Sequence, residues 1–291
     1  MSTTTPRSAN HEPANHQDRA LARHRVTSSL SMTAKIIVLL IALFLTLGPV
    51  VWTLVTALTP TDAAGHRTLS LAAFRDVFSK VDVIRLFWNS TLVTGLCAIG
   101  QMLTAALAGY AFARLRFRGA NLLFGIILAT MMIPMQVTIV PVFMLIRGMH
   151  LADTLLALIL PAIPTAFGTF LMRQYFMGIP DTLAEAAEVD GASPWTIFRS
   201  IYLPLATPGM AIVGILAFNS IWNEFFRPLI MTISEENFTL PLGLVSLQGQ
   251  LGTGSMSTIL AGVVLSMIPA LIVFIIGQRP LREGLTAGAV K

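Results

Sequence analysis

Four carboxylates stand within ten residues in a chain that is otherwise apolar nearly end to end. They are Asp181, Glu185, Glu188 and Asp190, and a glycine, Gly191, follows them directly. The first three fall on one stripe of a short helix, and a shallow apolar stripe lies beside it. The apolar stripe consists of Leu183, Ala186 and Ala187. A short helix with one acidic and one apolar stripe is suited to recognition by a partner with a complementary groove.

The elements that must position these carboxylates are two short helices joined by a sharp turn. Residues 182–185 fit the capping-box pattern, with Asp181 as a competing N-cap. The first helix should end at Gly191, because glycine adopts the left-handed conformation without a Cβ clash. A second helix is expected after Ser193 and before Pro204. Since about ten residues are too few for a stable isolated helix, another surface must pack on the first helix.

Two surfaces could receive this amphipathic segment. The first is the inner leaflet of a membrane, in which an amphipathic helix can lie flat. The acidic stripe argues against it, because the inner leaflet is anionic and attracts basic helices. A groove on a soluble cytoplasmic partner is therefore the better interpretation.

The composition of the chain is that of a membrane protein. Of its 291 residues, 55% are hydrophobic and only 11% are charged, with a mean hydropathy of +0.75. The net charge of +5 does not indicate nucleic-acid binding, because Lys and Arg fall at the ends of apolar runs rather than in one basic patch. The single cysteine, Cys97, lies in an apolar run, which excludes an internal disulfide and a cysteine-based metal site.

Six apolar runs are long enough to cross a bilayer, which predicts an all-α polytopic fold. They cover residues 36–58, 88–113, 121–146, 154–176, 207–232 and 258–277. Residues 1–29 carry few large apolar side chains and are predicted to be a disordered cytoplasmic tail. Residues 30–291 are then one transmembrane domain. Ala105, Gly109 and Ala113 stand at four-residue steps, which predicts a close helix contact on the second span.

The distribution of Lys and Arg sets the orientation, because cytoplasmic loops are enriched in both. These residues gather in the amino tail, after the second span, after the fourth span and at the carboxyl end. The clusters are Arg7, Arg19, Arg23, Arg25 and Lys35; Arg114, Arg116 and Arg118; Arg173 and Arg199; and Arg279, Arg282 and Lys291. Both termini are therefore expected in the cytoplasm, together with the loop at residues 177–206 and a carboxyl tail at residues 278–291.

The stretch EAAEVDGASPWTIFRSIYLPLATPG closely resembles the EAA loop of the membrane subunits of ATP-binding-cassette importers. The pattern is E-A-A, three residues, glycine, nine residues, isoleucine, one residue and L-P. Here these positions are Glu185, Ala186, Ala187, Gly191, Ile201, Leu203 and Pro204. The segments WNEFFRPLIMT, TLPLGL and QRPLREGLTAGAVK are similar to those of carbohydrate-importer permeases of the maltose-transporter type, and in particular to the shorter, six-span partner.

This resemblance implies a permease subunit in the cell membrane of a prokaryote. It would pair with a second, similar permease, two cytoplasmic ATPase subunits and an extracytoplasmic sugar-binding protein. Residues 177–206 would be the coupling element seated in an ATPase cleft, through Glu185, Ala186, Ala187, Asp190, Gly191, Ile201 and Pro204. The resemblance leaves the sugar open, and glycerol phosphates are an alternative cargo.

The chain itself is expected to bind no cofactor and no metal, and not to be an enzyme. It lacks the G-x-x-x-x-G-K-[ST] pattern that cradles nucleotide phosphates. ATP and Mg would therefore be held by the partner ATPases.

Two other classes of membrane protein compete with this interpretation. An intramembrane enzyme is disfavoured because all five histidines lie outside the predicted spans. A secondary transporter would place ionisable residues near the midplane. Only Glu224 and Arg227 lie within a span, and Glu224 stands about 25 Å along the fifth one. An ion-coupled secondary transporter of a small polar solute remains the alternative.

Polar residues within a span usually face the interior of the bundle. We therefore expect five residues on the substrate path: Gln136 in the third span and Asn219, Trp222, Asn223 and Glu224 in the fifth. The polar residues of this group could instead bond to neighbouring helices or to the partner permease. Arg227 could pair with Glu224, three residues away on the same helix.

Overall fold

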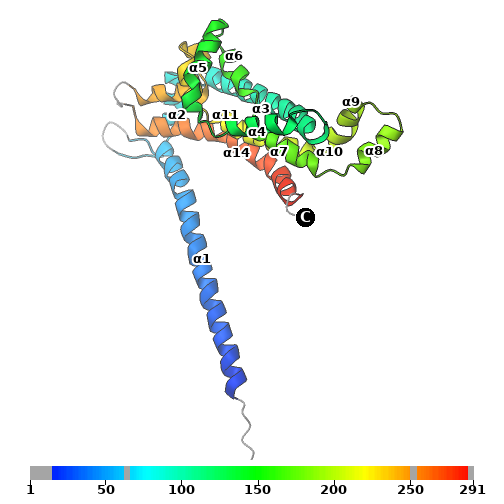
Figure 1. Cartoon of the computed structure of the whole chain (residues 1–291). Coiled ribbons are helices and arrows are strands. Elements are labelled where there is room, and N and C mark those ends of the chain that lie inside the picture. Colours follow the sequence, from blue (N-terminus) through cyan, green and yellow to red (C-terminus); the bar gives the residue numbers. More distant parts are fainter. Residues whose placement is uncertain (1–14, 62–65, 250–253, 288–291) are drawn as a thin grey trace, which may run out of the picture. The chain divides into compact units, whose positions relative to one another are not determined.

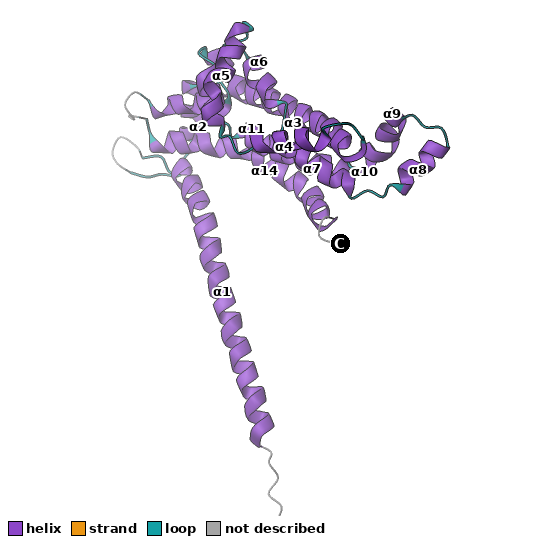
Figure 2. Ribbon diagram, in the orientation of Figure 1, coloured by secondary structure: helices purple, strands orange, loops and turns teal. Residues whose placement is uncertain are grey.

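The computed structural model describes residues 15–61, 66–249 and 254–287. Side chains are described for residues 32–278, except in the two gaps. Every regular element in those residues is a helix (Figure 2), apart from one isolated bridge between Thr61 and Arg67. The predicted all-α fold is thus confirmed. The chain divides into two compact units, residues 1–55 and residues 56–291, and each is described by itself.

Helix α1 (Asn15–Leu58) supplies the first span and most of the first unit. Its part from Met32 to Leu58 is apolar on all sides, with Leu39, Phe44 and Leu45 each more than half exposed, as expected of a helix that crosses lipid. The prediction of a disordered tail is wrong for residues 15–29, which are helical. They contain good helix formers and extend a helix that the span has already nucleated. Residues 1–14 lie outside the described residues.

Two long helical segments form the centre of the second unit (Figure 1). One is α3 (Val83–Arg114). The other is the sequence of α6 (Leu155–Ile159), η1 (Leu160–Ala162) and α7 (Ala166–Met177). The predicted small-residue contact is confirmed at Gly109, where an added Cβ would lie only 2.6 Å from Met172 Cβ. Close packing of α3 on α7 therefore requires a glycine at this position.

The predicted third span is not one straight helix. It consists of α4 (Ala120–Thr130) and α5 (Met135–Gly148), which are bent by 103° at the break. Pro134 is the N-cap of α5. Because proline has no N–H to donate and disfavours helical geometry in the residue before it, the helix ends ahead of Pro134.

The predicted fifth span is also broken. Helix α11 (Thr207–Trp222) has 16 residues and α12 (Phe226–Met231) has six. At about 1.5 Å per residue, α11 covers roughly 24 Å, less than the roughly 30 Å hydrocarbon core. The segment Pro194–Leu205 that precedes α11 is bent by 70° from it. The described residues hold four helices long and apolar enough to span, or up to six if each bent pair counts as one.

Shorter elements gather around the amino end of α3. They are α2 (Ala72–Lys80), η3 (Glu235–Asn237), α13 (Leu240–Gly243) and η4 (Leu244–Gln248). The last helix, α14 (Met256–Ala287), packs on α11 and α2. The tail predicted from residue 278 continues this helix to Ala287, and residues 288–291 lie outside the described part.

Candidate coupling site and substrate path

The predicted helix–turn–helix is present and projects at one end of the second unit (Figure 1). It consists of α8 (Thr182–Val189), α9 (Pro194–Ile197), a π-helical turn η2 (Phe198–Tyr202) and α10 (Leu203–Leu205). We call residues 181–206 the coupling loop. Gly191 forms the turn with φ +82°, which confirms the left-handed conformation expected from its type. An added Cβ at Gly191 would meet no atom within 4 Å, so only the backbone conformation restricts this position.

The starts of the two helices are capped differently from each other. The hydroxyl of Ser193 accepts from Thr196 N at 3.2 Å, which confirms the predicted N-cap of α9. The capping box predicted for α8 is absent, because Asp181 occupies the N-cap and no side chain caps the helix. The carboxylate of Asp181 instead forms an ion pair with Arg114 at the end of α3.

Aromatic side chains of α3, α7 and the coupling loop pack together in one group, which we call the aromatic socket. Tyr110 of α3 lies 4.8 Å from Phe198 and 5.3 Å from Tyr202, measured between ring centroids. Phe176 of α7 completes the group at 5.8 Å from Tyr110. Small and apolar side chains of the loop pack against this socket, namely Ala184, Ala187, Ala192 and Ile201. Ala184 and Ala187 are therefore the residues of α8 that pack on the permease itself, whereas Leu183 and Ala186 of the predicted apolar stripe are exposed.

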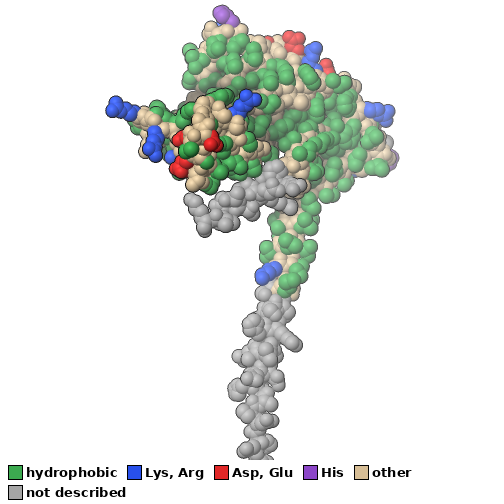
Figure 3. All heavy atoms as spheres, turned by 90° about the vertical axis from the view of Figure 1, so that its right-hand side faces the viewer, with side chains coloured by type: hydrophobic (Ala, Val, Ile, Leu, Met, Phe, Trp, Pro, Cys, Tyr) green, Lys and Arg blue, Asp and Glu red, His purple; other side chains and the backbone are tan. Residues whose placement is uncertain are grey.

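The opposite side of the coupling loop is exposed and unpartnered within the described residues. Among the predicted coupling residues, Glu185, Ala186, Asp190, Gly191 and Pro204 are exposed, whereas Ala187 and Ile201 pack inward. Val189 and Trp195, which the sequence did not single out, are 88% and 61% exposed. Carboxylates beside large apolar side chains on a projecting loop form a surface for docking to a protein. Figure 3 views this end of the molecule, with charged side chains among apolar ones.

A cavity of about 530 Å³ lies farther along the helices. Its polar lining comes from three segments that are distant in sequence: α3, the segment leading into α7, and the break between α11 and α12. The lining includes Gln101, Thr165, Phe167, Ser220, Glu224 and Arg227. Arg227 Nε lies 3.1 Å from Glu224 Oε1, which confirms the pairing expected at this spacing. Arg227 also donates to Leu158 O at 3.0 Å, so the ion pair ties this break to α6.

The predicted path residues divide into three groups. Glu224 lines the cavity. Asn219, Asn223 and Gln136 are exposed but are not among its lining residues, and Asn223 Nδ2 donates to Asn219 O at 2.8 Å. Trp222 does not line this cavity but is buried beside a further pocket of about 260 Å³, which Asn223 also lines. Its indole is 2% exposed, stacks on Phe218 and donates to Ser266 O at 3.0 Å.

Side chains of α3 donate hydrogen bonds to backbone carbonyls at η1, where prolines interrupt the regular helix. Gln101 Nε2 donates to Ala162 O at 2.8 Å and Thr104 Oγ1 donates to Ile163 O at 3.1 Å. Irregular backbone at membrane depth is tolerated only where such partners satisfy its carbonyls. Gln101 and Ser220 of the cavity were missed by the sequence argument, because only their neighbours in space distinguish them from other polar residues in spans.

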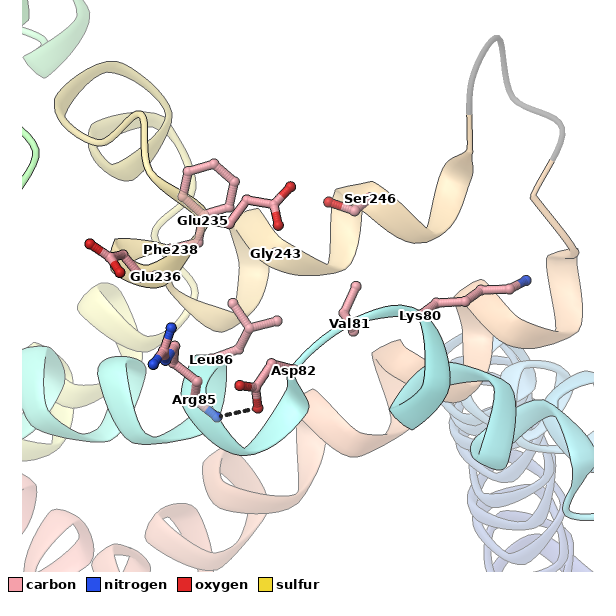
Figure 4. A pocket seen from close by; sticks show the side chains of 10 residues that line it. All are labelled: Lys80, Val81, Asp82, Arg85, Leu86, Glu235, Glu236, Phe238, Gly243 and Ser246. Atoms are coloured by element: carbon pink, nitrogen blue, oxygen red, sulfur yellow. Dashed lines mark hydrogen bonds between the residues drawn. The ribbon is translucent and has the colours of Figure 1, made fainter.

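A second, smaller pocket of about 180 Å³ lies at the amino end of α3 (Figure 4). It opens between the α2–α3 turn and the segment that contains η3 and α13. Charged side chains of both signs line it, namely Lys80, Asp82, Arg85, Glu235 and Glu236. Arg114 ends α3 and Asp82 caps its start, so this pocket and the coupling loop are about 48 Å apart along the helix. Among the described residues, no group of three or more His, Cys, Asp and Glu could hold a metal ion.

The turn before α6 is fixed to the turn after α12 by Asp153. Its carboxylate accepts from Ser234 Oγ at 2.5 Å, Ile233 N at 2.9 Å and Ser234 N at 3.0 Å. Asn237 Nδ2 donates to Asp153 O at 2.7 Å. The hydrogen bond from the Ser234 hydroxyl, followed by those from the two backbone amides, lowers the pKa of Asp153 to about 2. These donors stabilise the ionised carboxylate.

We predict that Asp153→Asn lowers the thermal stability of the purified protein. Asn tolerates the left-handed backbone of this position, φ +58°, so the variant changes mainly the charge and the acceptors. Because folding lowers the pKa of Asp153 to about 2 from 3.8, its stabilisation is complete above pH 4 to 5 and is lost as pH falls through 2. The difference in Tm between parent and variant should be constant from pH 5 to 8 and shrink below about pH 4. A difference independent of pH down to pH 2 would contradict this assignment.

The fold and these two sites define a class of protein. A polytopic helical membrane subunit has a cavity among its helices, lined by apolar side chains with a few polar ones, and presents a projecting helix–turn–helix at one end. Such a chain has the architecture of a membrane permease.

Comparison with known proteins gives the family. Residues 101–282 match the family described as binding-protein-dependent transport system inner membrane component. The chain is 37% identical over 228 residues to the arabinooligosaccharides transport system permease protein AraQ of Halalkalibacterium halodurans, covering 77% of this chain and 80% of that one. It is 33% identical over 259 residues to the lactose transport system permease protein LacG of Rhizobium radiobacter, covering 87% and 94%.

A solved structure has the same fold. A chain of a bacterial ABC transporter that imports the acidic polysaccharide alginate superposes with a TM-score of 0.78 at 23% identity, covering 87% of this chain and 97% of that one. The chain described here belongs to the family of binding-protein-dependent transport system inner membrane components. It is a multi-pass membrane permease subunit of an ABC importer.

Proposed function

We propose that this permease is one of two similar but distinct membrane subunits of an ATP-driven sugar importer. The observation that carries the proposal is the coupling loop, whose exposed face combines Glu185 and Asp190 with Val189 and Trp195. A loop of this kind fits the cleft of a cytoplasmic ATPase. The family and the sugar-transporting relatives support the same conclusion.

The two sites have complementary tasks in this proposal. Closure of the ATPase pair displaces the coupling loop, and the aromatic socket transmits the displacement to α3 and α7. The cavity beside Glu224 and Arg227 forms this chain's half of the translocation path. Because the cavity contains an ion pair rather than an unpaired charge, it suits a neutral, hydroxyl-rich ligand. The sugar-binding protein and the second permease would supply the remaining contacts.

The orientation follows from the same assignment. The coupling loop and both termini would lie in the cytoplasm, with the pocket of Figure 4 on the extracytoplasmic side, where a binding protein would dock. The chain would bind no nucleotide or metal and catalyse no reaction itself, since ATP and Mg belong to the ATPase subunits. Two ATPases, two permeases and one binding protein make up the proposed assembly.

Reconstitution in proteoliposomes tests the function. The purified complex should import radiolabelled lactose or an arabinooligosaccharide only with internal ATP and with external binding protein. Glycerol 3-phosphate serves as the probe for the alternative cargo. Import that is driven by a proton or sodium gradient, without ATP and by this chain alone, would contradict the proposal and indicate a secondary transporter.

A further inference from the structure

Arg114 makes a set of contacts that its place in the sequence does not indicate. It is the last residue of α3, and its side chain is only 13% exposed. The guanidinium pairs with the carboxylate of Asp181 at the start of α8. It also donates to the carbonyls of Phe176 and Ile179 at the end of α7. A single side chain therefore joins three elements.

The planar face of the Arg114 guanidinium contacts the aromatic socket. Arg114 Cζ lies 4.9 Å from the ring centroid of Tyr202, in the π-helical turn of the coupling loop. A guanidinium can bind a carboxylate, two carbonyls and a ring face together, because it has several donors in one plane and an open face. The carbonyl end of α7 also attracts a cation through the helix dipole. Lysine offers a point charge and could replace only part of this set.

The position of the coupling loop in the chain determines which helices it can move directly and which only through noncovalent contacts. The loop follows α7 directly and leads into α11 through a 70° bend at Ala206. It is not adjacent to α3 in the sequence. Arg114 supplies the polar link between α8 and α3, and Tyr110 of α3 supplies apolar contact with the second half of the loop.

We propose that Arg114 is a positioning residue for transport, which holds the start of α8 on α3 and α7 so that displacement of the coupling loop moves both helices together. The inference rests on the proposed function, because it concerns the transmission of ATPase closure to the path. Arg114 touches neither nucleotide nor sugar in this role.

The test compares Arg114→Gln and Arg114→Lys in the reconstituted complex. The readout is the number of lactose or arabinooligosaccharide molecules imported per ATP hydrolysed, normalised to assembled complex. We expect Arg114→Gln to lower this ratio about tenfold and Arg114→Lys to keep an intermediate value. Asp181→Asn should have a smaller effect, since the carbonyls and Tyr202 still hold Arg114. The double variant should be no worse than Arg114→Gln alone, because the two residues share one contact.

Arg116→Gln is the matched control, since Arg116 is exposed two residues away and no hydrogen bond or ion pair of its side chain is found in the described part. It should leave the ratio at the parent value. A merely structural role for Arg114 would reduce the amount of complex but not the sugar imported per ATP. An unchanged ratio in Arg114→Gln, or additive effects in the double variant, would overturn the inference.

A distance measurement covers the case in which Arg114→Gln assembles poorly. Spin labels at positions 116 and 189, both exposed, report the distance between the end of α3 and α8. The buried Cys97 is replaced by Ser beforehand. The distance distribution should be narrow in the parent complex and broad in Arg114→Lys, with and without ATP. Equally narrow distributions would overturn the inference. A parent complex without ATP-driven import would instead contradict the proposed function, and the role of Arg114 in transport would fall with it.

Discussion

Glu185→Lys is expected to prevent stable assembly of the permease with its ATPase. Glu185 is exposed on α8, and no hydrogen bond or ion pair of its side chain is found in the described part of the chain. The substitution should therefore leave the fold of the permease intact. A lysine in a cleft that receives an acidic helix places like charges together, which costs on the order of 3 kcal/mol. Such a cost weakens association roughly 100-fold.

Co-purification of the tagged permease with the ATPase subunits measures this effect. Glu235→Lys is the matched control, because it makes the same charge change at the opposite end of α3, in the pocket of Figure 4. The control should retain the ATPase, and both variants should reach the membrane in equal amounts. Full recovery of ATPase with Glu185→Lys would show that the exposed face of α8 is not the contact.

Gly191→Val is expected to uncouple ATP hydrolysis from transport while the complex still assembles. With φ +82°, Gly191 has a conformation that costs a β-branched residue roughly 1–2 kcal/mol or more. No neighbouring atom would obstruct the new side chain, so the strain acts through the backbone. Relief of this strain reorients α9 relative to α8, whereas the docking residues of α8 remain present. Stimulation of ATPase by the sugar-loaded binding protein should fall at least tenfold.

Two variants separate coupling from general strain. Gly191→Asn should keep most of the stimulation, because asparagine tolerates the left-handed region. Gly119→Val introduces equal strain into the α3–α4 turn, where φ is also +82° and space is also open. It should affect stability more than stimulation. If Gly191→Val keeps parental uptake and stimulation, the turn has no part in coupling.

Breaks in the spans show a limit of inference from hydropathy. The third predicted span had the right composition and length, yet it turns by 103° between α4 and α5. Prolines within predicted spans do not all have this effect, since Pro49 lies inside the continuous helix α1 and Pro141 inside α5. Whether a proline bends a span depends on whether neighbouring groups stabilise the broken geometry.

The substrate path shows the same limit for single residues. Of the residues predicted on the substrate path, Glu224 lines the larger cavity, whereas Trp222 is buried and does not line it. A tryptophan within an apolar span carries no information about which side of the helix faces a cavity. Gln101 and Ser220 line the cavity because of how α3, α7 and α11 pack together.

Features that depend on residues close together in the chain could be predicted before the structure was known. Apolar runs of sufficient length indicated where the candidate spans lie but not where two of them break. Gly191 and Ser193 indicated the turn and the second helix of the coupling loop, and a spacing of three residues indicated the pairing of Glu224 with Arg227. Backbone conformation and contacts between residues a few positions apart in the chain are local, so residue type and spacing suffice to predict them.

Contacts between residues far apart in the chain could not be predicted, because they depend on how the helices pack together. Arg114 lies 67 residues from Asp181, and Asp153 lies 81 residues from Ser234. From the sequence, Arg114 is one of several cations at the end of a span, and Asp153 is one polar residue in a short turn. Which partner each one meets depends on the close approach of α3 to α7 at Gly109 and on the bends of the broken spans. Packing fixes these geometries, and residue spacing does not, because close-packed side chains from distant segments must fit together simultaneously.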